Sequence, residues 1–313
     1  MKRTTVGGQA VLEGVMMRNG SKCAVAVRKP NKEIEVRPTE IHSIKEKYPF
    51  LKLPILRGIV SFVESLVVGM ETLTFSASFI EEEVEDGDFI DRFLEKHMQG
   101  TGEKVIMGIT IAISVVVAIL GFMILPYALS EVIKKFTNSQ TIALVAEGII
   151  RIGLFLGYMV LISQMQDIQR VFMYHGAEHK TINCLEHGDD LTVENVAKHS
   201  RLHKRCGTSF LFLVVLISIF VFFFIRFDSV LLKAGCRLLL VPVIAGISYE
   251  FLQLAGKSNT KLADKLSRPG MCLQYLTTRE PDADMIEVAI RSVEEVLDWK
   301  TYVEAVRKGE IED

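Results

Sequence analysis

The stretch KVIMGITIAISVVVAILGFMILPYALSE, residues 104–131, decides the fold class, because no charged residue lies between Lys104 and Glu131. About 20 consecutive apolar residues suffice for one helix to cross the hydrocarbon core of a bilayer. Similar apolar stretches recur along the chain, although two of them carry ionisable side chains. Together they predict four membrane spans, at residues 105–130, 141–165, 206–225 and 236–255.

Composition agrees with a membrane protein. The 313 residues are 49% hydrophobic, and the apolar ones gather in long blocks, which excludes a purely soluble chain. The 36 Lys and Arg nearly balance 38 Asp and Glu, so the bulk charge indicates no nucleic-acid partner. The five cysteines form no CxxC pair, so we expect reduced thiols rather than a disulfide framework. The opening MKRTTVGGQAVLEG lacks the apolar run of a secretory signal peptide.

Basic residues predict the orientation. The connection 166–207 between the second and third predicted spans holds six Lys and Arg, whereas the connections 131–140 and 226–235 hold two each. Positive loops stay in the cytoplasm, so we expect a multi-pass protein with both termini cytoplasmic. Residues 54–80 are also apolar, but Arg57, Glu64 and Glu71 recur every seven residues and share one helical face. This pattern predicts an amphipathic interfacial or re-entrant helix, whose charged face lines a path for substrate.

The remaining segments complete a mainly α organisation. AVAVR and EIEVR flank KPNK and predict a hairpin within a small β-rich N-terminal part. Apolar residues at helical spacing predict one amphipathic helix over 282–308. The expected order is a cytoplasmic β-rich segment 1–50, the amphipathic helix 54–80, an acidic linker 81–103, a transmembrane pair 105–165, a cytoplasmic His-rich loop 166–207, a second transmembrane pair 208–255 and a cytoplasmic segment 256–313.

The candidate chemistry lies in an H-x-x-E-H sequence at residues 175–179. On a helix, His175 and His179 are one turn apart, with Glu178 beside them. Two imidazoles so placed can hold Zn²⁺ or a similar divalent ion, and the carboxylate can act as a base toward water; inverzincin metalloproteases carry the same string. The alternative is a helix end at which the histidines cap carbonyls or meet lipid phosphates.

A third ligand has several candidates. Glu250 is preferred because a carboxylate inside a span usually faces a partner or an ion, although a pair with Arg or Lys across helices explains it equally well. His203 and Cys206 are the others, and both also fit an ordinary helix end before Gly207. His187 and His199 add to the local histidine density.

Two further features are weighed by spacing alone. Glu147 and Arg151 are one turn apart and predict a structural ion pair. Glu13 lies among Gly7, Gly8 and Gly14, which favours a strand with a glycine turn over a ligand or substrate contact.

The strings GGQAVLEGVMMR, YHGAEHKTI, RLHKRCGTSF, AGISYEFLQLAG and LTTREPD closely resemble the motifs of the YqhQ-like family of bacterial membrane proteins. That family is often described as predicted metal-dependent enzymes, and the match runs to about residue 290. The resemblance implies a bacterial cytoplasmic membrane and raises Glu13, while His187 and His199 fall outside its motifs and Lys204 stands where the family commonly has Pro. The implied motif positions are Glu13, His175, Glu178, His179, His203, Cys206 and Glu250.

The leading functional hypothesis is a membrane metal-dependent enzyme, a hydrolase acting at the cytoplasmic face on a lipid-linked or membrane peptide substrate. A transporter, with Glu64, Glu71 and Glu147 among the residues of a polar route that also includes Arg151 and Glu250, is one alternative. A non-catalytic, metal-stabilised assembly factor is another. Assembly into a homo-oligomer is compatible with each hypothesis.

Overall fold

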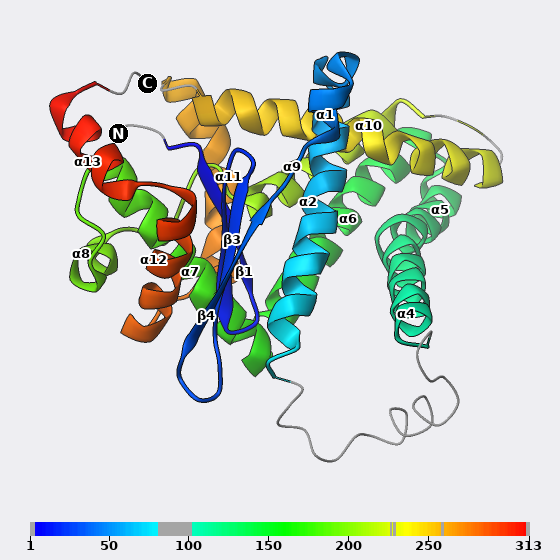
Figure 1. Cartoon of the computed structure of the whole chain (residues 1–313). Helices are drawn as coiled ribbons and strands as arrows, with labels where there is room; N and C mark the ends of the chain where they lie inside the picture. Colours follow the sequence, from blue (N-terminus) through cyan, green and yellow to red (C-terminus); the bar gives the residue numbers. More distant parts are fainter. Residues whose placement is uncertain (1–3, 81–101, 226, 228–229, 258–259, 311–313) are drawn as a thin grey trace. The chain divides into compact units, whose positions relative to one another are not determined.

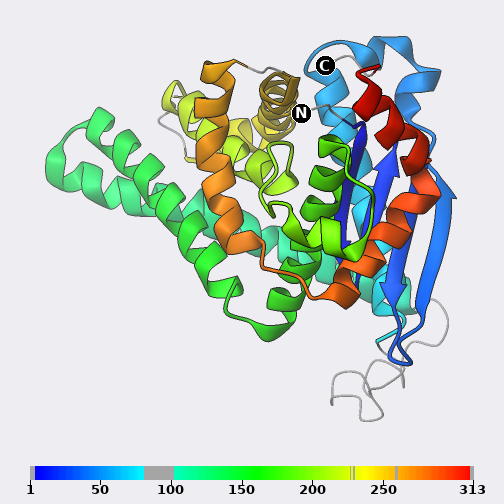
Figure 2. The same cartoon turned by 90° about the vertical axis from the view of Figure 1, so that its left-hand side faces the viewer.

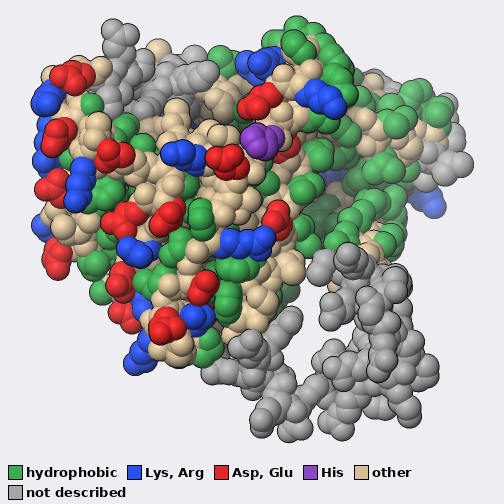
Figure 3. All heavy atoms as spheres, in the orientation of Figure 1, with side chains coloured by type: hydrophobic (Ala, Val, Ile, Leu, Met, Phe, Trp, Pro, Cys, Tyr) green, Lys and Arg blue, Asp and Glu red, His purple; other side chains and the backbone are tan. Residues whose placement is uncertain are grey.

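The computed structural model describes residues 4–80, 102–225, 227, 230–257 and 260–310, and the chain divides into two compact units (Figure 1). The first unit comprises Met1–Ile80, Met159–Ile217 and Val241–Asp313. The second comprises Glu81–Tyr158 and Ser218–Leu240. Figure 3 shows many charged side chains around α12 and α13 of the first unit and mostly hydrophobic ones on the described part of the second.

A four-stranded antiparallel sheet organises the first unit. Its strands follow the chain in order: β1 (Val6–Val11), β2 (Gly14–Asn19), β3 (Lys22–Arg28) and β4 (Ile34–Glu40). The expected hairpin around KPNK is confirmed as β3 and β4, with Arg28 opposite Ile34. The β1–β2 turn has only two residues between the paired Val11 and Gly14.

Helices cover both faces of this sheet. Helices α7 (Gln166–His187) and α12 (Ala283–Val296) pack on one face, where Val15, Met17 and Ala24 join a large apolar core. Helix α2 (Leu56–Ala77) covers the other face, with Val68 and Phe75 against the buried side chains of β2 and β3. Figure 2 shows α12 in front of the strands and α2 behind them. The sheet is therefore the middle layer of an α/β sandwich.

The first unit also contains shorter connecting helices and parts of the long apolar ones. Gly58 of α2 lies so close to Gly246 of α10 that an added Cβ atom would be 2.7 Å from the Gly246 carbonyl oxygen. These two glycines let the backbones of α2 and α10 approach closely. The other elements are α1 (Ile44–Lys47), η1 (Pro49–Lys52), α8 (Val193–Lys198), α11 (Lys261–Thr277), α13 (Trp299–Lys308), the start of α9 (Gly207–Phe223) and the end of α10 (Val230–Lys257).

The described residues of the second unit form helices and the short connections between them. It consists of α4 (Gly102–Ile119), the π-helical turn η3 (Leu120–Ile124), α5 (Leu125–Thr137), most of α6 (Gln140–Ile162), the end of α9 and the start of α10. The π-helical turn comes just before Pro126, which cannot donate a backbone hydrogen bond. The α-helical hydrogen-bonding pattern is therefore interrupted there, while the helical, apolar stretch continues into α5.

Among the described residues, four helices are long and apolar enough to cross a membrane, so this is a mainly α membrane protein. They are Leu56–Ala77, Gly108–Thr137, Gln140–Ile162 and Leu232–Ala255. Three of these correspond to expected spans. The expected span 206–225 becomes α9, which has only 17 residues because the backbone tightens to i→i−3 hydrogen bonds at Phe224 and Ile225.

Helix α2 takes the place of the expected amphipathic helix 54–80. One face covers the sheet, whereas apolar side chains on the rest of its surface remain exposed. Its exposed apolar residues include Val63, Leu66, Val67, Met70 and Leu73. Length and composition alone would also let this helix span a bilayer.

One local expectation needs correction, and a second is refined. The predicted single helix 282–308 is two helices, because Leu297 and Asp298 leave the helical conformation and the Asp298 carboxylate caps α13 by accepting from the Thr301 N–H. The connection expected at 166–207 begins with the 22-residue helix α7, which carries the histidine motif and is mostly buried in its second half; this refines the expectation. Of the expected acidic linker 81–103, residues 81–101 lie outside the described residues, and Gly102 begins α4.

Candidate metal centre

The two histidines of the H-x-x-E-H sequence lie side by side on α7, as their spacing predicts. Their ring centroids are 4.4 Å apart. His179 is buried and His175 is partly buried, so the pair is largely shielded from solvent. Helix α7 brings them together because residues i and i+4 share a helical face.

Backbone carbonyls orient both rings. His175 Nδ1 donates to the Thr277 carbonyl oxygen at 2.8 Å, and His179 Nδ1 donates to the Arg201 carbonyl oxygen at 2.6 Å. A carbonyl can only accept, so each Nδ1 carries a hydrogen and each Nε2 is the atom that can bind a metal once it has lost its proton. Histidines that bind metals are commonly fixed through the second nitrogen in this way.

Cys206 completes a set of three donors. Its Sγ lies 3.2 Å from His175 Nε2, and one ligand atom from each of Cys206, His175 and His179 lies within 4.8 Å of the others. Thiolate and imidazole donors suit Zn²⁺ and disfavour Mg²⁺ or Ca²⁺. Three protein ligands leave one tetrahedral position for water or substrate, the arrangement typical of catalytic zinc.

The electrostatics of the cluster favour a thiolate. Burial opposes ionisation of Cys206, but the neighbouring His175 and His179 outweigh it and lower the pKa of Cys206 well below its usual range. Burial likewise opposes protonation of His175, yet the sulfur raises the pKa of His175 to about 9. The Thr208 N–H, in the first turn of α9, also donates to Sγ at 3.4 Å. The thiolate is the form of cysteine that binds metals.

Glu178 lies next to this cluster in a buried position, with 5% of its surface exposed. Burial raises the pKa of the Glu178 carboxyl group, while His175 and His179 lower it in part. Gly8 of β1 makes room for it: a Cβ atom there would be 2.9 Å from Glu178 Cγ and Cδ. The Gly8 N–H also binds the carboxylate. A glycine in the GGQAVLEG motif thus positions a carboxylate 170 residues away in the sequence.

His203, an expected ligand, lies beside the cluster but faces another group. Its ring centroid is 5.7 Å from that of His179, whereas its Nε2 lies 3.5 Å from Glu186 Oε2. Gln274 fixes the backbone by accepting from the His203 N–H at 2.8 Å and donating to its carbonyl oxygen at 2.7 Å. Glu186 also binds Arg205 and accepts from the Thr4 N–H.

Glu250, the preferred third ligand, is held by Arg57. Arg57 Nε donates to Glu250 Oε1 at 2.7 Å, and a second hydrogen bond joins Arg57 Nη2 to Glu250 Oε2. The structure therefore does not bring Glu250 into the donor set of His175, and the ion pair weighed as its alternative is present. The physical reason is that a fork-shaped guanidinium satisfies both carboxylate oxygens at once.

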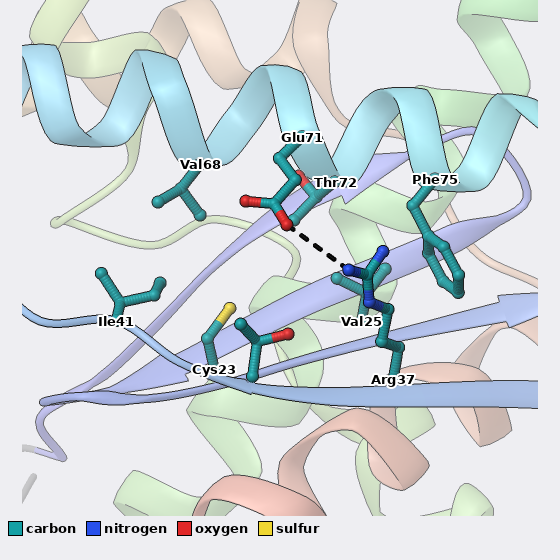
Figure 4. Close-up of a pocket in the computed structure, with 9 residues that line it drawn as sticks. Cys23, Val25, Arg37, Ile41, Val68, Glu71, Thr72 and Phe75 are labelled. Carbon is teal, nitrogen blue, oxygen red and sulfur yellow. Dashed lines mark ion pairs between the residues drawn. The ribbon is translucent and has the colours of Figure 1, made fainter.

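The other residues of the expected substrate path also have partners. Glu64 accepts from the Ser43 hydroxyl at 2.6 Å and pairs with Lys45. Glu71 pairs with Arg37 at 3.6 Å across a small groove between α2 and the sheet (Figure 4). These contacts explain the charges on α2 as links to neighbouring elements.

Glu13 binds α7 rather than the donor cluster. Its carboxylate oxygens accept two hydrogen bonds of 2.5 Å from Arg170, and the Tyr174 hydroxyl is 3.3 Å away. Glu13 adopts a φ of 49° in the tight β1–β2 turn, a conformation that residues other than glycine rarely take. The turn therefore anchors the sheet to the helix that carries the histidines.

Sequence reasoning missed the groups that orient the cluster. Thr277 and Arg201 act through backbone carbonyls, and every residue type has one, so the sequence does not single them out. Gly8 acts by having no side chain, which leaves room for Glu178. His187 and His199 form a separate pair with ring centroids 4.9 Å apart, and His199 binds Asp189.

A membrane protein with a sandwiched sheet and a buried His–His–Cys cluster is thus the class that these features define. The chain belongs to the family described as "Protein of unknown function (DUF1385)", whose model matches residues 53–299. It is 34% identical over 303 residues to "Uncharacterized protein YqhQ" of Bacillus subtilis (strain 168), covering 96% of this chain and 95% of that protein. The expected YqhQ-like resemblance is confirmed. No solved structure matches the chain.

Proposed function

We propose that this protein is a membrane metal-dependent hydrolase whose ion, Zn²⁺, is held by His175, His179 and Cys206. The observation that carries the proposal is the convergence of one thiolate and two oriented imidazoles within 4.8 Å. A bound ion of this kind polarises water or a substrate carbonyl. Glu178 is buried beside the donors, burial raises its pKa, and its carboxylate can serve as the general base.

The location of the cluster suggests the substrate class. Cys206 directly precedes α9, a largely apolar helix of 17 residues, so this donor lies at the start of an apolar helix. A lipid-linked molecule or a membrane peptide could present its polar bond there. The basic residues of 166–207 favour the cytoplasmic face.

Metal content tests the proposal. The full chain is purified in detergent without chelators and compared with His175→Ala, Cys206→Ser and Glu178→Gln. We expect one equivalent of zinc in the wild type and in Glu178→Gln, and loss of zinc from the other two variants. His199→Ala is the matched histidine control, because His199 binds Asp189 and lies outside the donor set. Wild-type protein free of transition metal, with Cys206 open to alkylation, would refute the proposal.

The Glu178→Gln variant distinguishes a catalytic metal from a structural one. If Glu178→Gln keeps zinc and its fold but loses function in a cellular complementation assay, the ion serves a reaction. Full function in that variant would contradict the role of Glu178 as the base and leave the ion structural.

A further inference from the structure

A second polar cluster lies inside the second unit and shares no residue with the His–His–Cys donor set. It is built from α5, α6 and α10, and its cationic members are almost fully buried. The exposed fractions are 4% for Arg151, 3% for Lys233 and 2% for Arg237. Among the described residues, its carboxylates are Glu147, which is buried, and Glu131, whose side chain is 34% exposed.

One carboxylate serves both guanidinium groups. Arg237 pairs with Glu147 at 2.6 Å between Nη1 and Oε1, and its Nη2 donates a hydrogen bond to Oε2 at 2.9 Å. Arg151 Nη2 donates to the same Oε1 at 2.7 Å. A single negative charge cannot neutralise two positive ones, so this trio retains an excess positive charge.

Lys233 adds another cation, and no described residue places an acceptor within hydrogen-bond distance of its Nζ. Its Nζ lies 3.8 Å from Glu131 Oε1, which is longer than a hydrogen bond. Glu131 is also shared with Lys134 at 3.8 Å. The ammonium also lies over the face of the Tyr127 ring, 4.4 Å from the ring centroid. Lys233 is therefore buried with its hydrogen-bonding capacity largely unused.

An unpaired donor of Arg237 also indicates a missing acceptor in this cluster. Arg237 Nε is buried and has no hydrogen-bond partner among the described residues. Lys233 and Arg237 are one turn apart on α10, so the ammonium group and the unpaired Nε lie on one side of that helix. Three buried cations face two carboxylates, and an uncompensated charge in a membrane helix is costly.

We propose that this cluster binds a phosphate group, with Lys233 and Arg237 as its main contacts. Lys and Arg are the side chains that bind phosphate most strongly, and one such group would supply the missing negative charge and acceptors. Lys233 and Arg237 are the second and sixth residues of the candidate span Leu232–Ala255. At 1.5 Å per residue they lie within about 9 Å of its end, a depth that lipid headgroups reach by local adjustment. The phosphate of an anionic lipid therefore fits, as does a free phosphate.

Thermal unfolding of the full chain in neutral detergent tests the site. Mixed micelles with phosphatidylglycerol are compared with phosphatidylcholine and with inorganic phosphate alone. We expect phosphatidylglycerol to raise the unfolding temperature of the wild type in a saturable manner, and phosphatidylcholine to have little effect. Equal stabilisation by inorganic phosphate would identify a free phosphate as the ligand and still support the site. No stabilisation by either anion would overturn it.

Matched lysine variants locate the effect. Lys233→Met removes the buried charge and keeps an unbranched apolar chain against Tyr127, whereas Lys134→Met removes a partly exposed lysine that shares Glu131. We expect at least a tenfold weaker midpoint for phosphatidylglycerol in Lys233→Met and an unchanged one in Lys134→Met. If Lys233→Met does not fold, Lys233→Gln takes its place. Unchanged lipid response in the folded Lys233 variant would refute the assignment.

Discussion

Replacing Gly176 by alanine tests how backbone carbonyls orient the metal donors. Gly176 follows His175 on α7, and an added Cβ atom would lie 2.0 Å from the Arg279 carbonyl oxygen. Real Cβ contacts are essentially never shorter than 3.0 Å, so the segment around Arg279 must move away from α7. That segment carries the Thr277 carbonyl, which holds His175 Nδ1 at 2.8 Å.

The expected loss follows from these contacts. Moving the segment stretches the His175–Thr277 hydrogen bond and the bond from the Arg279 N–H to the Phe172 carbonyl oxygen, 2.8 Å long. Two hydrogen bonds at about 1 kcal/mol each and about 1–3 kcal/mol of overpacking oppose a gain of about 1 kcal/mol in helix propensity. We therefore expect the free energy of unfolding to fall by about 2–4 kcal/mol, and zinc to bind about 10–100-fold more weakly.

Two assays on the same preparation check this. Competition with a chromophoric chelator gives the zinc affinity, and circular dichroism on heating gives the unfolding temperature. Gly153→Ala is the control, because Gly153 is a helical glycine with nothing within 4 Å of its added Cβ atom. It should match or slightly exceed the wild type. Zinc affinity and stability equal to wild type in Gly176→Ala would refute the orienting role of the Thr277 carbonyl.

Three further outcomes are expected. Burial lowers the pKa of His203, so the folded protein holds this ring neutral while the unfolded chain protonates it below about pH 6.5. The stability that the neutral ring contributes is therefore lost as the pH falls. His203→Gln should flatten the decline in unfolding temperature on acidification. Burial raises the pKa of Cys184 to about 12, so a maleimide should label the exposed Cys272 rapidly and Cys184 only after unfolding, as mass spectrometry of digests will show; equal rates would contradict this packing. Glu147→Gln removes the carboxylate shared by two buried guanidinium groups and should lower the free energy of unfolding by about 3–5 kcal/mol. Thermal unfolding should show a far smaller effect for Glu131→Gln. Similar effects of the two variants would show that the pairs are not buried together.

Local sequence patterns predicted much of the fold. Alternation gave the β3–β4 hairpin, and uninterrupted apolar runs gave the long helices, because both signals depend on residues near in the chain. The patterns failed where tertiary contacts set the boundary. The apolar period over 282–308 continues through Leu297 and Asp298, yet the chain turns there so that α12 can cover the sheet and Asp298 can cap α13.

The candidate site shows the same division. The spacing of His175, Glu178 and His179 follows from helical geometry, so the sequence alone sets their common face. The choice among Glu250, His203 and Cys206 required the folded chain, because each was chemically suitable as a third ligand. Arg57 engages Glu250 and Glu186 engages His203, which leaves Cys206 nearest to the imidazoles.

Sequence by itself therefore determined the membrane character, the hairpin and the paired histidines, since hydrophobic length and helical or strand period act locally. Only the tertiary structure decided the third donor, the carbonyls of Thr277 and Arg201 that fix the rings, and the place of Gly8 against Glu178. These depend on which distant segments pack together, and close packing selects among side chains that composition treats alike.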